Sequence, residues 1–450
     1  MKFGGTSVAD AEAMTRVVDI VRRQWESSPK PGGLPVIVVS ALSKVTDGLI
    51  RTVECARSGD AEKAAALVGD LLGRHIAIAQ SLTSPQRTDE LLNALRAQFG
   101  ELGERVVAAV SKREVTPADH DAIVATGELA SSRIVAAAFA EQGLPAVWID
   151  ARTVLVTDAE HMSAVPDMDA TCRRVGTEIA PVIARGEIPV LGGFIGASGA
   201  GVTTTLGRGG SDYSASIFGT CVDASEIQIW TDVDGMLTAD PRVVPSPRVV
   251  PQLSFAEASE LAYFGAKVLH PSTILPAVSK NIPVRILNSR RPENPGTLIT
   301  AEGRHDGQLA ALACKRGVTV IDITSSRMLM AHGFLRRLFE VFERSKTAVD
   351  VVTTSEVSVS VTVDDTRRLD EIVASLRAFS EVACEPNMAI VSVVGEKLLE
   401  DPALFGRAIV SLGPIPLRLV SQAASRRNIT FVLRDADVTE AMTRLHDAFF

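Results

Sequence analysis

The sequence has few of the residues that several classes of protein need. Aromatic residues make up only 4% of the 450 residues, so aliphatic side chains must dominate the cores. The seven histidines never fall at metal-ligand spacing, and the five cysteines contain no CxxC pair: Cys55, Cys172, Cys221, Cys314 and Cys384. We therefore expect reduced thiols, no metal site built by the protein and a cytoplasmic location.

Long apolar runs and basic blocks are missing as well. No stretch approaches 18 uninterrupted apolar residues, and the N-terminus lacks the features of a signal peptide. A net charge of −8 without Lys/Arg blocks argues against binding of nucleic acid. With 46% apolar residues, a chain of this length can bury large cores in two or three domains, and we expect no contact with membranes.

The first 300 residues alternate strand-like and helical segments. Apolar, strand-like runs occur at 34–42, 145–150, 187–196, 225–233 and 282–288, whereas 60–142 is almost wholly helical. This alternation predicts an α/β fold with a mainly parallel sheet and helices on both faces. Ligands of such sheets bind beyond the carboxyl ends of the strands.

The remaining residues contain a tandem repeat with a period of about seventy residues. Each copy has the order strand, helix, strand, strand, helix, as expected of a βαββαβ unit. The second copy ends one strand short. The strand-like segment 309–315, which precedes the first copy, can supply the missing strand, and the two copies would then be interleaved.

Two glycine-rich motifs carry candidate site residues. In KFGGTSV, Lys2 lies beside glycines at the turn from the first strand to the first helix, which suits a phosphate cradle; the alternative is a tight turn with a solvated lysine. In TTTLGRGGSDYSAS (203–216), Arg208 can grip a carboxylate through two hydrogen bonds, and Ser211 or Asp212 is expected to cap the next helix. The alternative is an ordinary glycine-rich loop.

An acidic motif, WTDVDGMLTADPRVV (230–244), follows a predicted strand. It lacks the spacing of an EF-hand and better suits a nucleotide or its Mg²⁺, the alternative being a solvated acidic turn. Lys267 in FGAKVLHP and Glu128 in TGELASS are both expected near helix starts, where a carboxylate such as that of Glu128 also has a purely structural use.

Together these motifs, with FAEASELAYFGAKVLHPSTI (255–274), resemble the signatures of the aspartate kinases in the amino acid kinase family. The segment 332–362 resembles the effector-binding segment of the monofunctional, lysine-sensitive branch. The resemblance implies an αβα kinase domain over 1–300 and two interleaved ACT domains, the first at 316–386 and the second at 309–315 plus 387–450.

The resemblance also implies an activity: transfer of the γ-phosphoryl of ATP, with Mg²⁺, to the β-carboxylate of L-aspartate, in the first step of lysine, threonine and methionine synthesis. A carboxylate of pKa ~4 is already ionised at neutral pH, so no general base is needed. Catalysis then depends on positioning and on neutralising charge. Feedback inhibition by L-lysine and a homodimer through the ACT domains, or a tetramer, are implied too.

Residue by residue, the resemblance gives Lys2 to the transferring phosphoryl group, with Asp212 orienting it. Arg208 would hold the α-carboxylate of the substrate and Glu128 its ammonium group, with Ser40, Thr46 and Ser211 lining the pocket. The residues implied to contact the nucleotide are Lys2, Gly4, Gly5, Thr6, Ser7, Thr231, Asp232, Leu237, Arg242, Lys267 and Val268. Leu237 replaces a tyrosine common among relatives, so ATP affinity is expected to differ.

The effector pocket implied in the first ACT unit centres on Asp350, whose carboxylate would bind an effector ammonium group. Ala331 stands where serine is common, which removes one hydroxyl group. Phe339 and Phe342 are expected to be only core residues of an amphipathic helix. The full pocket is Met328, Gly333, Phe334, Leu335, Val349, Asp350, Thr354 and Glu356.

Three alternatives stay open at this point. Another amino acid kinase would act on glutamate, an acylated glutamate or a nucleotide. A catalytically inactive chain would sense amino acids through its ACT pair. Finally, threonine could replace lysine as the effector.

Overall fold

The computed structural model describes residues 1–28, 33–265, 271–303, 309–328, 332–396, 398, 400–422 and 426–450. Contacts divide the chain into two compact units. The first contains Met1–Met236 and Val268–Ala301, and the second contains Leu237–Lys267 and Glu302–Phe450. A stretch of the predicted kinase region, Leu237–Lys267, is thus part of the same unit as the repeat.

The main sheet of the first unit runs in the order β3-β5-β2-β1-β8-β10-β11. All neighbours in this series are parallel except β10 and β11, which confirms the mainly parallel sheet. Its short first strand lies near the middle. The strands are β1 (Lys2–Phe3), β2 (Ile37–Val39), β3 (Ala146–Ile149), β5 (Ile188–Gly192), β8 (Ile227–Thr231), β10 (Val284–Asn288) and β11 (Thr297–Thr300).

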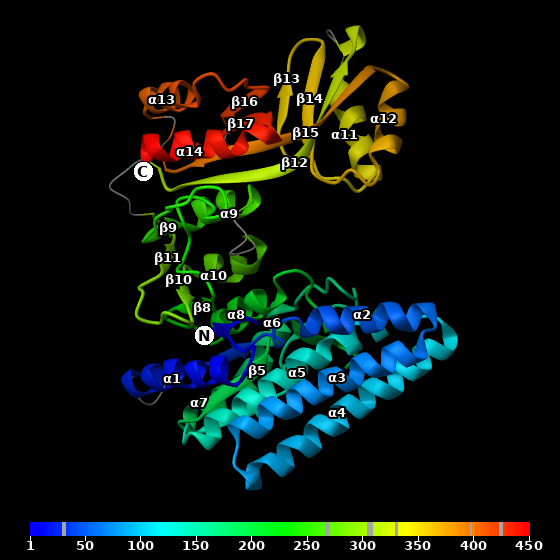
Figure 1. The fold of residues 1–450 in the computed structure, drawn as a ribbon, viewed down its shortest axis with the longest axis vertical. Coiled ribbons are helices and arrows are strands. Elements are labelled where there is room, and N and C mark those ends of the chain that lie inside the picture. The colour runs from blue at the N-terminus through cyan, green and yellow to red at the C-terminus, as the bar shows by residue number, and fades with distance from the viewer. Residues whose placement is uncertain are drawn as a thin grey trace. The chain divides into compact units, whose positions relative to one another are not determined.

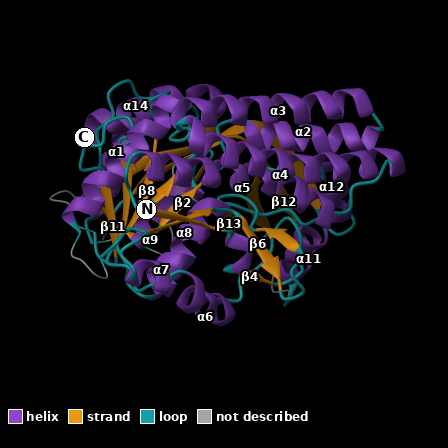
Figure 2. Cartoon of the chain, turned by 90° about the horizontal axis from the view of Figure 1, so that it is seen from below, coloured by secondary structure: helices purple, strands orange, loops and turns teal. Residues whose placement is uncertain are grey.

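Helices cover both faces of this sheet because side chains alternate along each strand. Ile37 and Val39 on β2 join the core formed with α1 (Ala11–Ser27), α2 (Val45–Ser58), α3 (Ala61–Leu82), α4 (Pro85–Lys112) and α5 (Pro117–Glu141). Figure 2 shows α2, α3, α4 and α5 running side by side. Val38 faces the other way, toward α8 (Gly210–Cys221), which packs with α6 (Met168–Glu178) and α10 (Leu275–Ser279).

By length and composition α5 could cross a membrane, but 83% of its apolar window is buried inside the protein. It is therefore read as the central helix of a core. A small second sheet lies next to α5 and consists of β4 (Val156–Thr157), β6 (Ile195–Ser198) and β7 (Thr203–Thr205). Short helices complete this unit: η1 (Ala151–Thr153), α7 (Ala180–Ala184) and η2 (Pro271–Ile274).

The second unit is built on one sheet in the order β13-β14-β12-β15-β17-β16 (Figure 1). Its two central strands, β12 (Ala311–Thr324) and β15 (Glu381–Val394), are 14 residues long. The predicted strand 309–315 and the first strand of the first repeat copy are joined in β12, because Gly317 (φ 72°) lies at a bulge through which pairing with β15 continues. The other strands of this sheet are β13 (Val352–Thr354), β14 (Ser358–Val363), β16 (Leu419–Gln422) and β17 (Asn428–Arg434). Strand β9 (Gln252–Ser254) of the second unit is not part of this sheet.

Two separate cores lie on this sheet. One is formed with α11 (Phe334–Arg344) and α12 (Leu369–Arg377), the other with α13 (Pro402–Leu412) and α14 (Val438–Phe449). Ala239 and Val244 of the 237–267 segment, which also contains α9 (Phe255–Tyr263), join the second core. Short helices η3 (Ser326–Met328) and η4 (Asp435–Asp437) complete the unit.

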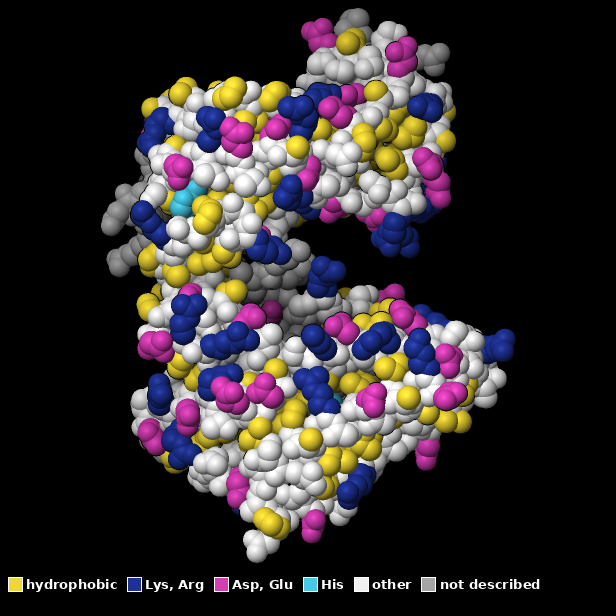
Figure 3. All heavy atoms as spheres, viewed as in Figure 1, with side chains coloured by type: hydrophobic (Ala, Val, Ile, Leu, Met, Phe, Trp, Pro, Cys, Tyr) yellow, Lys and Arg dark blue, Asp and Glu magenta, His cyan; other side chains and the backbone are white. Residues whose placement is uncertain are grey.

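Phe342 is buried, as predicted, but the same prediction for Phe339 is wrong, because its side chain is 38% exposed. The buried stripe of α11 follows Phe334, Leu338 and Phe342 at a spacing of four residues and leaves Phe339 at its edge. On the face drawn in Figure 3, Lys and Arg side chains are interspersed with Asp and Glu over both units and form no basic patch.

The prediction that every cysteine is reduced is also wrong. Cys172 in α6 and Cys221 at the end of α8 form a disulfide, with their Cα atoms 4.8 Å apart. Because the two residues are separated by 49 positions, only the packing of α6 on α8 brings them together. Cys55, Cys314 and Cys384 are free thiols.

We predict that Cys172→Ser lowers the urea midpoint of the first unit, because the disulfide restricts the unfolded chain by up to about 4 kcal/mol for a loop of this length. All three tryptophans belong to the first unit, so their fluorescence reports its unfolding. Dithiothreitol should lower the urea midpoint of the parent by as much as the Cys172→Ser substitution does, and it should leave the midpoint of Cys172→Ser unchanged. The control is Cys384→Ser, which removes an exposed free thiol. If the parent and Cys172→Ser had equal urea midpoints in the absence of reductant, the disulfide would be contradicted.

Candidate active site

A cavity of about 630 Å³ lies at the carboxyl edge of the main sheet, within the first unit. The sequence motifs that contribute to it are more than two hundred residues apart in the case of Lys2 and Asp212, yet the fold brings their predicted site residues together. They are Lys2, Gly5, Ser40, Thr46, Glu128, Arg208, Ser211 and Asp212. The order of the strands explains part of this, since β1 lies between β2 and β8. The remaining residues come from α5 and from the segment that leads from β7 into α8.

An ion pair between Lys2 and Asp212 closes one side of the cavity. The Nζ atom of Lys2 lies 2.6 Å from Oδ1 of Asp212, and the two side chains are only 10% and 15% exposed. Asp212 is in the first turn of α8, where the helix dipole favours a carboxylate. The predicted cap is wrong: α8 begins at Gly210, its N-cap is Gly209 (φ 74°), and neither Ser211 nor Asp212 caps it. The carboxylate of Asp212 is thus left for Lys2.

The turn after β1 is held by backbone contacts. The Gly4 N–H donates to the carbonyl of Trp230 (2.9 Å), and the Gly5 carbonyl accepts from Ser43 N–H (3.1 Å). A Cβ on Gly5 would lie 2.9 Å from the carbonyl oxygen of Ala41, so only glycine fits. Ser7 is buried, and its hydroxyl forms a hydrogen bond with that of Ser289 (2.8 Å), which holds the turn against the segment that follows β10. Thr6 is partly buried.

Glu128 lies in the middle of α5, so its predicted place at a helix start is wrong. The helix begins at Pro117, where Thr116 caps it by accepting from the Asp119 N–H. Oε1 of Glu128 accepts from Ala41 N–H at 3.3 Å, while Oε2 has no hydrogen-bond partner among the described residues. Burial raises the pKa of Glu128 to about 8, although the Ala41 N–H and the charge of Lys2 oppose the rise. Such a carboxyl group suits a cationic ligand group.

Arg208 is exposed and lies on the loop between β7 and α8. This loop needs a left-handed backbone on both sides of Arg208, which Gly207 (φ 76°) and Gly209 (φ 74°) supply. Ser40 follows β2, and its carbonyl accepts from the Ser131 hydroxyl (2.8 Å). Thr46 is in the first turn of α2.

The predicted nucleotide residues are only partly described. Thr231 ends β8 next to β1, and Asp232 after it is exposed. Leu237 and Arg242 belong to the second unit, where Arg242 forms an exposed ion pair with Asp240 (2.6 Å). Lys267 and Val268 lie outside the described residues. Asp234 is engaged structurally with Asn288, Asn294 and Arg291.

The predicted effector residue Asp350 already has a cation within its own chain. Its side chain is 2% exposed, and Oδ1 lies 2.7 Å from Nζ of Lys315 and 3.2 Å from the hydroxyl of Tyr263. Burial raises the pKa of Asp350 despite the nearby lysine, and raises the pKa of Tyr263 to about 12. Lys315 also contacts Asp364 (2.8 Å).

The other predicted effector residues differ in exposure. Phe334 packs edge-on against Phe379 in the core, and Gly333 (φ 82°) precedes it as the N-cap of α11. Ala331 lies outside the described residues. Met328 and Val349 are partly buried, and the exposed members are Leu335, Thr354 and Glu356.

Comparisons with known proteins agree with this geometry. The family model described as "Amino acid kinase family" matches residues 1–288, and an ACT domain model matches residues 391–449. Lysine-sensitive aspartokinase 3 of Escherichia coli (strain K12) is 34% identical over 457 residues, covering 100% of this chain and 98% of that protein. The chain belongs to the aspartokinases of the amino acid kinase family.

Other aspartokinases are similar over the whole chain. Aspartokinase 1, chloroplastic, of Arabidopsis thaliana is 35% identical and covers 100% of this chain and 80% of its own length. The crystal structure of E. coli aspartokinase III in complex with aspartate and ADP (R-state) has a TM-score of 0.85 at 33% identity, covering 99% of this chain and 98% of that one. Its complex with lysine and aspartate (T-state) has a TM-score of 0.82 at 33% identity, covering 100% and 98%.

Several residues that line this aspartokinase cavity were not predicted from the sequence. They include His120, Met162, Phe194 and Thr205. The segment around Met162 is irregular and contains none of the glycine-rich or acidic motifs. His120 has one weak signal, because it lies shortly before TGELASS on the same helix.

We predict that the carboxyl group of Glu128 titrates near pH 8 rather than near 4.5. Carbon-13 NMR of labelled glutamate side chains measures this, with Glu128→Gln assigning the signal. Because the charge of Lys2 favours the ionised carboxylate, Lys2→Met should move the midpoint further upward. A midpoint near the ordinary value, or one that Lys2→Met leaves unchanged, would contradict the environment described here.

Proposed function

We propose that this aspartokinase transfers the γ-phosphoryl group of ATP to the β-carboxylate of L-aspartate, giving 4-phospho-L-aspartate and ADP. This reaction is the first step toward lysine, threonine and methionine. The observation that carries the proposal is a single cavity lined by Lys2, Glu128, Arg208 and Asp212. Two cations and a buried carboxyl group complement the charged groups of an acidic amino acid and a phosphoryl donor.

In the proposed complex, Arg208 binds the α-carboxylate of aspartate through its planar guanidinium group. Glu128 binds the α-ammonium group, and its ionised form is stabilised when that cation arrives. Ser40, Thr46 and Ser211 contribute polar groups around the substrate. Two fixed ends leave the β-carboxylate as the group free to react.

The β-carboxylate attacks without a general base because it is already ionised. Lys2 neutralises negative charge that spreads over the transferring phosphoryl group, an interaction that strengthens in the transition state. Asp212 orients Lys2, and the turn after β1 offers the backbone N–H of Gly5 to the phosphates, since the Gly4 N–H already donates to Trp230.

We place the nucleotide against Thr6, Ser7, Thr231, Asp232, Leu237, Arg242, Lys267 and Val268. Mg²⁺ usually keeps several waters and binds through substrate phosphates and one or two carboxylates. The exposed Asp232 is an oxygen donor of that kind, so the residues present fit an ion that enters with ATP. When bound, Mg²⁺ would neutralise phosphate charge. Leu237 in place of tyrosine is expected to alter ATP affinity.

We further propose the domain boundaries given by the repeat: a kinase domain at 1–300, one ACT domain at 316–386 and a second at 309–315 plus 387–450. L-Lysine is the proposed inhibitor, and the proposed assembly is a homodimer through the ACT domains, or a tetramer. A cytoplasmic location is proposed as well. Since disulfides are uncommon in the cytosol, the reductant experiment on Cys172 also bears on this location.

Hydroxamate formation from amino acid, Mg·ATP and hydroxylamine tests the function. Activity with L-aspartate that exceeds activity with L-glutamate by orders of magnitude supports the proposal, because a fixed cavity distinguishes the lengths of the two side chains. Titration with lysine, threonine and methionine then identifies the effector. Preference for glutamate, or no turnover with aspartate, would overturn the proposal.

We predict that Asp350→Asn abolishes inhibition by lysine while the uninhibited rate stays near that of the parent. An effector ammonium group needs the buried carboxylate, and inhibition requires preferential binding to an inactive state, typically by roughly 1–3 kcal/mol. Asp365→Asn, at an exposed pair with Arg367, is the matched control.

The Lys315→Met variant should be inhibited at lower lysine concentrations than the parent, because the substitution removes the internal cation that is paired with Asp350. Inhibition curves for the three variants and the parent measure both effects. Equal inhibition of Asp350→Asn and the parent, or inhibition by threonine alone, would contradict this assignment.

A further inference from the structure

One buried carboxylate beside the cavity has no part in the mechanism described so far. Asp121 lies on α5, seven residues before Glu128, so both project from the same side of the helix. Its side chain is fully buried. Unlike Glu128, it is surrounded by hydrogen-bond donors.

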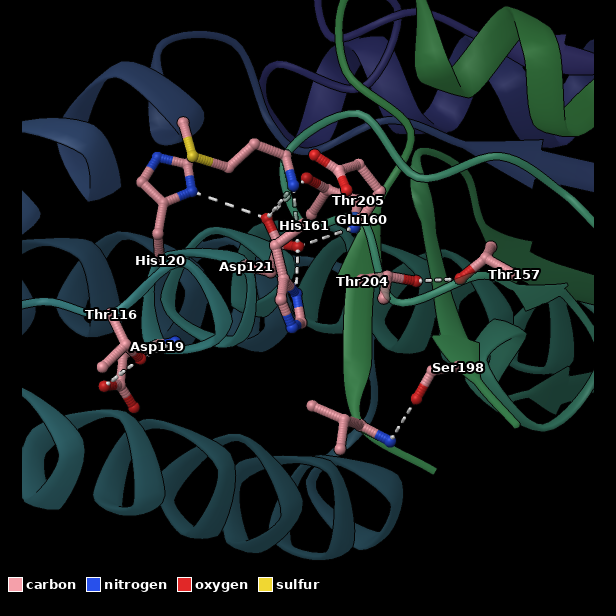
Figure 4. Close-up of polar contacts among 12 residues, drawn as sticks. Thr116, Asp119, His120, Asp121, Thr157, Glu160, His161, Ser198, Thr204 and Thr205 are labelled. Atoms are coloured by element: carbon pink, nitrogen blue, oxygen red, sulfur yellow. Dashed lines mark hydrogen bonds and ion pairs between the residues drawn. The ribbon is translucent and has the colours of Figure 1, made fainter. Parts of the chain in front are cut away.

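Four residues contact the carboxylate of Asp121 (Figure 4). Oδ1 accepts from the Thr205 hydroxyl at 2.7 Å, and Oδ2 accepts from the Thr205 N–H at 3.2 Å. Oδ2 also accepts from the Met162 N–H at 3.0 Å, and His161 Nδ1 lies 2.9 Å from it. On the other side, His120 Nδ1 lies 3.6 Å from Oδ1.

These donors keep Asp121 charged in the interior. Burial by itself would raise the pKa of Asp121, but the contacts from His120, Thr205, Met162 and His161 outweigh it and hold the pKa below its usual range. A buried charge is costly unless it is fully paired, so the carboxylate holds its hydrogen-bond partners in place. We call this carboxylate and its partners the Asp121 cluster. It joins three segments: α5, the irregular turn around Met162, and the end of β7.

Two of these segments hold the loop that carries Arg208. Thr205 is the last residue of β7, and Arg208 follows three positions later. On the other side, a Cβ at Gly207 would lie 3.0 Å from the Met162 carbonyl oxygen, so this loop packs directly on the turn. Because His120, Met162 and Thr205 all line the cavity, the Asp121 cluster lies directly behind the cavity wall.

Deepening the proposed function on which it rests, we infer that Asp121 is a positioning residue for the amino acid substrate. Its carboxylate fixes Thr205 and Met162 by hydrogen bonds. These two residues fix the loop of Arg208, so that its guanidinium group lies where it can bind the α-carboxylate of aspartate. His161 completes the set by donating from Nδ1. The effect acts on substrate binding, whereas Lys2 and Asp212 act on phosphoryl transfer.

The same small sheet offers a matched control. The hydroxyl groups of Thr157 and Thr204 form a buried hydrogen bond of 2.7 Å between its strands, and neither residue lines the cavity. Thr204 is adjacent to Thr205 in the chain. A variant at Thr204 therefore disturbs a buried polar contact of this sheet without removing any contact of the Asp121 cluster.

The kinetic test uses Asp121→Asn, which keeps the shape but turns one acceptor oxygen into a donor that opposes the N–H groups. We expect the KM for aspartate to rise ~10-fold or more, as for loss of hydrogen bonds to a charged group, with kcat and the KM for ATP near those of the parent. Thr204→Val should leave all three values unchanged. Combining Asp121→Asn with Arg208→Lys should raise the KM for aspartate little beyond Arg208→Lys alone, because both act through one guanidinium group.

His161 supplies a second pair of variants in case Asp121→Asn folds poorly. The amide nitrogen of asparagine can take the place of Nδ1, so His161→Asn should keep the parent KM for aspartate, whereas His161→Ala should raise it. A general loss of stability would instead lower kcat and affect both variants alike, and that result would overturn the inference.

Hydrogen exchange gives a readout that does not depend on the reaction. Amides at 205–210 should exchange faster in Asp121→Asn and His161→Ala than in the parent, and at the parent rate in Thr204→Val. If the parent fails to phosphorylate aspartate, the proposed function fails, and exchange still decides whether Asp121 holds the loop. Unaltered exchange, or an unaltered KM for aspartate in an active Asp121→Asn enzyme, would overturn the inference.

Discussion

The ion pair between Lys2 and Asp212 is the interaction on which the site depends. It joins the first strand of the chain to the first turn of α8, and it is mostly removed from water. Two features of the fold make it possible: β1 lies between β2 and β8, and Gly209 caps α8 so that no side chain of the first turn is used as a cap. Without this pair a lysine at the carboxyl edge of the sheet would have no fixed direction.

Two carboxyl groups on one side of α5 show how environment sets their roles. Asp121 is surrounded by donors and stays ionised, so it fastens the cavity wall. Glu128 receives one N–H group and has an oxygen without a partner among the described residues, so burial favours its neutral form. In the proposed complex, the α-ammonium group of the substrate is the charge partner of Glu128. Two carboxyl groups in opposite charge states thus lie two helical turns apart.

Local patterns predicted much of this architecture. Apolar runs identified the parallel sheet, and two glycine-rich motifs identified Lys2, Arg208 and Asp212. Arg208 follows β7 of the small sheet, so no edge shared with β1 predicted that it lies near Lys2. The contacts that escaped prediction depend on packing between distant segments. The Cys172–Cys221 disulfide needs α6 to lie on α8, and the contact of His161 with Asp121 needs an irregular turn that no motif marks. Asp350 was expected to bind an effector ammonium group, but in the structure it forms an ion pair with Lys315 of β12.

A double-mutant cycle in kcat tests most directly whether the Lys2–Asp212 pair organises catalysis. Lys2→Met and Asp212→Asn should each lower kcat, Lys2→Met on the order of 10²-fold or more, as for other deletions of electrostatic stabilisers. Because Asp212 acts through Lys2, the double variant should be no slower than Lys2→Met alone. Losses that multiply in the double variant, or a Lys2→Met enzyme within a few-fold of the parent, would contradict the account.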